Sequence, residues 1–322
     1  MIYEEIKQIK PDIEIQTLFY RTSTLICYGA KMDKLDPIEI DPKTFLRQHF
    51  SLPALPKVVT EVQEVMQSDN VSVSRVVDII QKDPALVAQI LKIVNSAYYS
   101  FTQEISNIKF AVAYLGLHQV FHILLSFSVI DTLVIKEKSE MKQFWFHSFY
   151  TALCSKLLEK RLEPLLSFDE LWSAAILHDI GKLVYLKFFP IHYKALKEYC
   201  NKNGSLFSEA EKHFSLPASA YLGTLLCDRW HLPVRLRDAC ECHGLSELIH
   251  LSGNRSSDIF KRIICLANLF ACLSTNELNH DLKGKIIKTI MAAMNLSEEQ
   301  FLTFMGEIYA LKLEVENLNK WF

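Results

Sequence analysis

Glycine is scarce in this chain, with nine residues in 322. Because glycine supplies the backbone conformations of tight hairpin turns, its scarcity disfavours a turn-rich β protein. Leucine, alanine, lysine and glutamate are plentiful by contrast, and these residues favour helices. Half of the residues are hydrophobic and 22% are charged, which excludes a disordered chain. The length allows one large domain or two ordinary ones, and we expect an all-α fold.

The chain also lacks a charge excess of either sign and a long apolar run. Its formal net charge of −2 provides no basic surface of the kind that nucleic-acid binders have. The longest apolar stretch, residues 120–135, is interrupted by polar side chains and falls short of the about 20 residues that span a bilayer. Residues 1–5 include two glutamates and no apolar segment of a secretory signal. We expect a cytoplasmic protein whose partners are neither nucleic acid nor membrane.

The motifs of the common nucleotide-binding loops and hydrolases are missing as well. The sequence contains no glycine-rich phosphate loop, no Gly-x-Ser-x-Gly elbow, and no kinase or cyclase signature. Its eight cysteines fall mostly inside apolar helical patterns, which is typical of reduced core residues. Disulfides and a phosphate-binding loop are therefore not expected.

Composition changes along the chain divide it into four segments. Residues 1–45 contain β-branched and aromatic runs and predict a short extension with a small β element. Residues 46–137 and 138–245 each predict a bundle of helices. Residues 246–322 predict further helices that complete the second bundle.

Start and stop signals place the helices of the first bundle. Ser72 precedes an apolar helical pattern and predicts an N-cap. Asp83 followed by Pro84 predicts a second helix start. Ser106 is predicted to cap a later helix, which Gly116 ends.

The second bundle carries similar signals. Capping-box patterns begin at Ser167 and Ser208, and Gly181 is expected to stop or loosen the helix before it. Later helices are predicted over residues 216–230, 233–243, 258–274, 282–293 and 297–317.

His178 and Asp179 end an otherwise apolar helix. Burial of two such side chains without partners is costly, so either they bind something together or neighbouring groups satisfy them. Neutral imidazole and carboxylate both suit transition metals. The pair alone leaves two alternatives open, a metal site and a buried hydrogen-bonded cluster.

Five segments of the sequence occur in an order that resembles the HDOD domain, an all-helical relative of the HD phosphohydrolase superfamily. They are Lys82-Asp83-Pro84-Ala85-Leu86, Asn95-Ser96-Ala97-Tyr98-Tyr99, Ala111-Val112-Ala113-Tyr114-Leu115-Gly116, Leu177-His178-Asp179-Ile180-Gly181-Lys182 and Trp230-His231-Leu232-Pro233. The resemblance covers roughly residues 48–245. It implies two packed helical bundles, the second HD-domain-like, in a bacterial signalling or regulatory family whose members have commonly lost part of the metal site.

The resemblance also implies which residues stand at the HD site. His147 fits the histidine of the first helix, and His178 and Asp179 fit the pair on the second. Asn268 stands where the last aspartate is expected. An amide is neutral and a weaker ligand than a carboxylate for a divalent cation, and it also weakens the orientation of other ligands. The resemblance therefore implies a degenerate metal site with no assigned catalytic residue.

Three further residues are candidates for the pocket around that site. Lys182 follows the pair directly and is expected either to meet a phosphate or to pair with a carboxylate. Ser219 stands where many relatives have a histidine. His243 is expected to face the pair, although Gly244 follows it where a second histidine often occurs.

Two functions remain open from the sequence. The preferred one is a non-catalytic signal-transduction module that binds a signalling protein or a small nucleotide. The alternative is a phosphohydrolase that acts on a nucleotide or cyclic dinucleotide with one divalent ion of iron, manganese, nickel or zinc. In either case we expect the ligand or partner in the groove between the two bundles.

Two other constellations have simpler interpretations. His118 and His122 share a helix face, but Gln119 replaces the glutamate of the zinc-protease pattern, so they are expected to line the interface between the bundles. The segment Cys240-Glu241-Cys242-His243 offers three soft ligands. A structural zinc would need a fourth ligand from elsewhere, and none is expected there.

Overall fold

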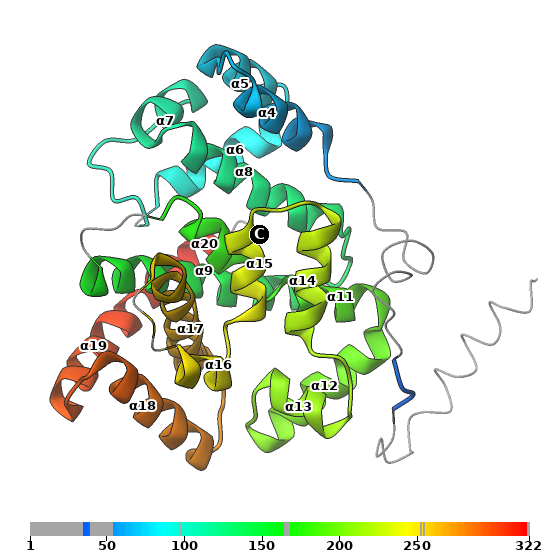
Figure 1. The fold of residues 1–322 in the computed structure, drawn as a ribbon, viewed down its shortest axis with the longest axis vertical. Helices are drawn as coiled ribbons and strands as arrows, with labels where there is room; N and C mark the ends of the chain where they lie inside the picture. Colours follow the sequence, from blue (N-terminus) through cyan, green and yellow to red (C-terminus); the bar gives the residue numbers. More distant parts are fainter. Residues whose placement is uncertain are drawn as a thin grey trace, which may run out of the picture. The chain divides into compact units, whose positions relative to one another are not determined.

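The computed structural model describes residues 35–38, 54–96, 98–163, 168–251, 253 and 255–320. The chain divides into two compact units, residues 1–36 and 37–322, and every helix named below belongs to the second (Figure 1). The predicted β element lies outside the described residues, apart from the irregular segment 35–38.

The described residues form helices and no strand, which confirms the all-α prediction. In chain order the helices are α4 (Lys57–Gln67), α5 (Val73–Ile80), α6 (Pro84–Val94), α7 (Ile108–Leu115), α8 (Leu117–Thr132), α9 (Lys138–Leu162), α10 (Leu171–Leu177), α11 (Ile180–Phe188), α12 (Pro190–Asn203), α13 (Phe207–His213), α14 (Ser219–Arg229), α15 (Val234–Glu241), α16 (Leu245–His250), α17 (Ser256–Thr275), α18 (His280–Met294), α19 (Glu298–Ala310) and α20 (Lys312–Asn319). No helix of the described residues is both long and apolar enough to cross a membrane.

Helices α4–α8, blue to teal in Figure 1, pack against one another. The side chain of Ser72 accepts a hydrogen bond from the Arg75 amide, as its predicted N-cap role requires. Asp83 caps α6 in the same way, with Pro84 at the first helical position. The cap of α7 is Asn107, not Ser106 as predicted, because the asparagine carbonyl reaches the free amide of Phe110.

Helix α9 lies at the centre of the second bundle and packs against α10, α17 and α20. Helix α17 is buried at every position from Ile263 to Cys272, so no solvated face remains in that part of the helix. Helix α10 contacts α9 and α17 of the second bundle and α8 of the first. The two bundles therefore share a continuous core through α10.

The structure corrects two predicted helix boundaries in this half. The predicted helix over residues 297–317 is two helices, α19 and α20, which meet at Leu311. The predicted cap at Ser208 is wrong because the N-cap of α13 is Leu206, two residues earlier. There the carboxylate of Glu209 accepts from the backbone amide of Leu206.

The prediction for Gly181 is also wrong, because α10 already ends at Leu177 and this glycine is the second residue of the next helix, α11. An added Cβ would lie 2.7 Å from the carbonyl carbon of Ser219 and 2.8 Å from the amide nitrogen of Gly223, and closer still to the Ser219 carbonyl oxygen. Gly181 therefore allows α11 and α14 to approach backbone to backbone. This approach fixes the start of α11, and with it Asp179.

Candidate metal centre beside a polar cavity

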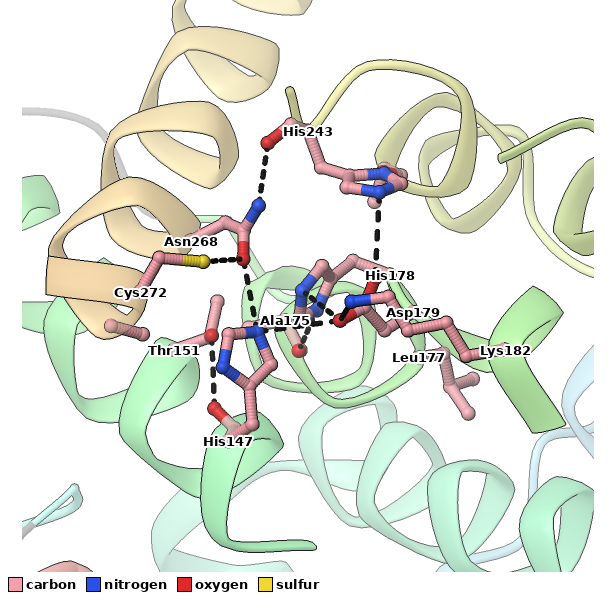
Figure 2. A network of polar contacts seen from close by, with 12 residues as sticks. His147, Thr151, Ala175, Leu177, His178, Asp179, Lys182, His243, Asn268 and Cys272 are labelled. Carbon is pink, nitrogen blue, oxygen red and sulfur yellow. Dashed lines mark hydrogen bonds and ion pairs between the residues drawn. The ribbon is translucent and has the colours of Figure 1, made fainter. Parts of the chain in front are cut away.

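A turn between two short helices presents the His178–Asp179 pair. Helix α10 ends at Leu177, His178 is its C-cap, and Asp179 is the residue before α11. The helical conformation is interrupted at Asp179, and the two neighbouring side chains converge rather than diverge by the about 100° of adjacent helical positions. Helix α9 brings His147 to the same point (Figure 2).

Asp179 is the hub of the cluster. Its Oδ2 atom lies 3.3 Å from Nε2 of His147 and 3.4 Å from Nε2 of His178. Its Oδ1 atom lies 3.4 Å from Nε2 of His243, so three imidazoles face one carboxylate (Figure 2). The carboxylate and the His178 ring are almost fully buried.

Asn268, on α17, completes the cluster with its amide. Its Oδ1 lies 2.9 Å from Nε2 of His147, and its Nδ2 donates to the backbone carbonyl of His243 at 2.7 Å. The second bond fixes the orientation of the amide, so that the carbonyl oxygen faces the imidazoles. The structure thus places an oxygen at this position that could bind a metal ion, but this oxygen belongs to a neutral amide and not to a carboxylate.

The hydrogen bonds of two histidines define where their ring protons are. Nδ1 of His178 lies 2.7 Å from the carbonyl oxygen of Ala175, and Nδ1 of His243 lies 3.2 Å from that of Ala239. A carbonyl oxygen only accepts, so both Nδ1 atoms carry a proton. Burial also lowers the pKa of His147 to about 3 and that of His243 to about 4. Neutral imidazole is the form that binds metals.

Buried polar atoms without a partner mark a place where an ion or ligand would be held. Among the buried side-chain atoms described, Nε2 of His178 and Oδ1 of Asp179 have no hydrogen-bond partner. The candidate ligand atoms of His147, His178 and Asp179 all lie within 4.8 Å of one another. Two ligand atoms that bind one ion at about 2.1 Å lie roughly 3.0 to 3.4 Å apart. The distances from Oδ2 of Asp179 to the two histidine nitrogens match this separation. The cluster therefore fits a divalent transition metal, with His147, His178 and Asp179 as ligands and Asn268 beside them.

Lys182 already provides one positive charge at this site. Its Nζ lies 2.5 Å from Oδ2 of Asp179, one turn along α11. Burial alone would raise the pKa of the Asp179 carboxyl, but the Lys182 ammonium and His178 outweigh it and hold that pKa well below its ordinary value. Asp179 is therefore ionised, and Lys182 is its nearest counter-ion.

A cavity of about 1100 Å³ opens beside the cluster. Its lining comes from helices α9, α11–α17 and α20, all of them in the second half of the chain. The groove expected between the two bundles is therefore not where this cavity lies. Lys182, Ser219 and His243 all line it. Ser219 stands apart from the Asp179 contacts, because its backbone amide donates to Glu211 at 2.8 Å.

Glu211 is a cavity residue that sequence reasoning missed. It is 3% exposed, lies on α13 and lines the cavity. Burial raises the pKa of its carboxyl to about 7, against a smaller lowering effect of the hydrogen bonds from Ser219. The sequence shows only the pattern Ser208-Glu209-Ala210-Glu211, which predicts a helix start. Its burial depends on the packing of α13 near α14, for which no local signal exists.

Replacing Glu211 with glutamine is expected to make stability less dependent on pH. Between pH 4.5 and about 7 the folded protein retains a proton on Glu211 that the unfolded chain has released. Wild-type stability therefore falls as the pH rises through this range. We expect Glu211→Gln to gain roughly 2 to 3 kcal/mol over wild type between pH 5 and pH 8, measured by urea unfolding. A difference that stays constant across this range would contradict the assignment.

The two other histidine and cysteine patterns form no metal cluster in the described part of the chain. His122 is buried and lies 3.3 Å from the Ser173 hydroxyl of α10, at the predicted interface between the bundles, whereas His118 is exposed. Cys240 lies 3.7 Å from Cys227, while His243 is directed at Asp179. Cys240 and His243 therefore point to different partners.

Comparison with known proteins agrees with this architecture. The HDOD domain model matches residues 52–245. Three solved structures share the fold: an HDOD domain protein of unknown function from Geobacter sulfurreducens, a putative phosphohydrolase from Shewanella amazonensis SB2B and a putative signal transduction protein from Marinobacter aquaeolei VT8. Their TM-scores are 0.64, 0.62 and 0.61 and their identities 20%, 20% and 17%. The alignments cover 87%, 86% and 93% of this chain, respectively. They cover 97%, 98% and 64% of the three solved chains.

A curated relative from Treponema pallidum (strain Nichols), an uncharacterized protein, is 24% identical over 233 residues. The match includes 72% of this chain but only 42% of that relative. At these identities the solved structures support the fold alone, and the site must be interpreted from its own residues.

Proposed function

This chain belongs to the HDOD family, and from that premise we propose that it is a regulatory module that binds a signalling protein or a small nucleotide without turning it over. The observation that carries this proposal is Asn268. Its amide is held at 2.9 Å from His147 and 2.7 Å from the His243 carbonyl, where an HD hydrolase is expected to have a carboxylate. The neutral amide removes one of the two negative charges that would balance a divalent ion.

The remaining negative charge is already neutralised. Asp179 is paired with Lys182 at 2.5 Å, so an ion entering the cluster would meet a site of about zero net charge. When bound, a divalent metal would supply Lewis acidity to a substrate phosphoryl group. A cluster with one carboxylate and an adjacent ammonium holds a divalent ion less tightly than two carboxylates would, which favours binding of a ligand without hydrolysis.

The packing of α10 offers a path from the cavity to the first bundle. His178 and Asp179 follow α10 directly, and α10 packs against α8. The Ser173 hydroxyl of α10 lies 3.3 Å from the His122 ring of α8. A ligand that shifts the His178–Asp179 turn would therefore shift a surface of the first bundle, where a protein partner could bind.

A metal-dependent phosphohydrolase is the second candidate. It is favoured by the convergence of His147, His178 and Asp179 within 4.8 Å and by the unpartnered atoms of His178 and Asp179. Its substrate would be a nucleotide or cyclic dinucleotide in the cavity of about 1100 Å³. The two candidate functions differ in whether the neutral amide of Asn268 prevents hydrolysis.

The substitution Asn268→Asp distinguishes them. Restoring the carboxylate is expected to tighten Mn²⁺ binding by about 10- to 100-fold and to permit nucleotide hydrolysis that the wild-type chain does not show. Mn²⁺ affinity is measured by isothermal titration, and hydrolysis by phosphate release from mono- and dinucleotides. The matched control is Asn276→Asp, at another asparagine that lines the cavity, and it should change neither. An unchanged metal affinity in Asn268→Asp would show that this position is not at the ion.

A further inference from the structure

The Lys182–Asp179 ion pair occupies an atom that the metal would need. Oδ2 of Asp179 accepts from Nζ of Lys182 at 2.5 Å and also faces Nε2 of His147 at 3.3 Å and of His178 at 3.4 Å. A divalent ion held by these two histidines would lie against the same oxygen. Two cations at one carboxylate oxygen repel strongly in a buried site, so the ammonium must leave when the ion enters.

The cavity provides a second carboxylate for the displaced ammonium. Lys182 is 28% exposed at its side chain and lines the cavity together with Glu211. The two groups attract each other electrostatically. The ring of Phe207, on the same helix as Glu211, lies 5.5 Å from the ammonium, within the range of a cation–π contact. The flexible four-carbon stem of a lysine allows such a movement without a change in the backbone.

We infer that Lys182 is a built-in competitor for the metal at Asp179, and that a divalent ion entering the cluster moves the Lys182 ammonium toward Glu211. The exchange keeps both carboxylates neutralised, Asp179 by the ion and Glu211 by the lysine. It also transfers a positive charge from the cluster to the α13 wall of the cavity. Metal occupancy thereby changes the charge presented to any cavity ligand, whether or not that ligand is turned over.

The direct test is the Mn²⁺ affinity of the full chain with and without this ammonium. Mn²⁺ is chosen because cysteine thiolates bind it less readily than zinc, and titration at pH 8 keeps Glu211 ionised, above its pKa of about 7. Lys182→Met removes the competitor and keeps the aliphatic stem. We expect its Mn²⁺ dissociation constant to fall by about tenfold or more, since a charge-assisted hydrogen bond no longer has to be broken.

The matched control is Lys212→Met. Lys212 lines the same cavity but makes no ion pair with the residues that the structure describes, so its removal should change the dissociation constant less than twofold. Circular dichroism and thermal melting establish that each variant is folded. Equal affinity in wild type and Lys182→Met, weaker binding in the variant, or no Mn²⁺ binding by either protein would each overturn the exchange.

A second variant has the opposite expected sign and leaves the ion pair intact. Glu211→Gln removes the acceptor of the displaced ammonium, and we expect Mn²⁺ to bind about fivefold more weakly. Glu277→Gln, at an exposed cavity carboxylate, is the control and should have no effect. Unchanged affinity in Glu211→Gln would overturn the movement of Lys182 toward this residue. These affinities carry no information on turnover, so they fail or succeed separately from the proposed function.

Discussion

Gly181→Ala is expected to destabilise the protein by at least about 3 kcal/mol, or to prevent folding. The new methyl group would overlap the Ser219 carbonyl and lie 2.8 Å from the amide nitrogen of Gly223. These are backbone atoms of α14 and cannot rotate away as a side chain can. Helices α11 and α14 would have to separate, which would open the core beside Asp179. Guanidinium unfolding measures the loss.

Two glycines of the same chain serve as controls for this prediction. Gly284 in α18 and Gly306 in α19 have no heavy atom within 4 Å of an added Cβ among the described residues. Alanine at either position should be neutral or should stabilise by about 0.5 to 1 kcal/mol, because glycine is a poor helix former. If Gly181→Ala behaved like these controls, the close approach of α11 and α14 would not exist in solution.

Asp179→Ala is expected to cost about 3 to 5 kcal/mol of the free energy of unfolding, because it leaves the Lys182 ammonium without its partner in a largely buried site. The pair is short, at 2.5 Å, and the carboxylate side chain is only 2% exposed. Adding Lys182→Met to Asp179→Ala should recover part of this loss, since the unpaired charge is then gone. A double-mutant cycle from urea unfolding at pH 7 measures the coupling.

An exposed ion pair provides the comparison. Arg161 and Glu307 lie 3.1 Å apart with side chains 42% and 43% exposed, so Glu307→Gln should cost less than about 1 kcal/mol. A cost for Asp179→Ala as small as that of Glu307→Gln, or no coupling to Lys182, would show that the cluster does not stabilise the fold.

Local signals in the sequence predicted the helical class and several helix starts. The cap at Ser72 and the Asp83–Pro84 start need only a side chain and an amide within one turn, so the sequence contains all the information. Ser106 and Ser208 failed because a neighbouring residue supplied the bond instead. Such shifts of one or two residues are the usual error of boundary prediction.

For the candidate site too, the sequence could predict some residues and not others. The positions of His147, His178, Asp179 and Asn268 followed from a resemblance, and the structure brings these four side chains together. Glu211 could not be foreseen, because its burial arises from the packing of α13 beside a cavity that residues 139–319 create together. The role of Gly181 likewise depends on α14, which follows about 40 residues later.

The measurement that decides most directly between a regulatory module and an enzyme is nucleotide hydrolysis by the Mn²⁺-loaded wild-type chain. Phosphate release from mono- and dinucleotides is compared with that of His147→Gln, a variant of a candidate ligand whose side chain is only 15% exposed. We predict that the two proteins release phosphate at the same background rate. Repeated turnover by the wild type that His147→Gln abolishes would contradict the proposal and establish a metal-dependent phosphohydrolase.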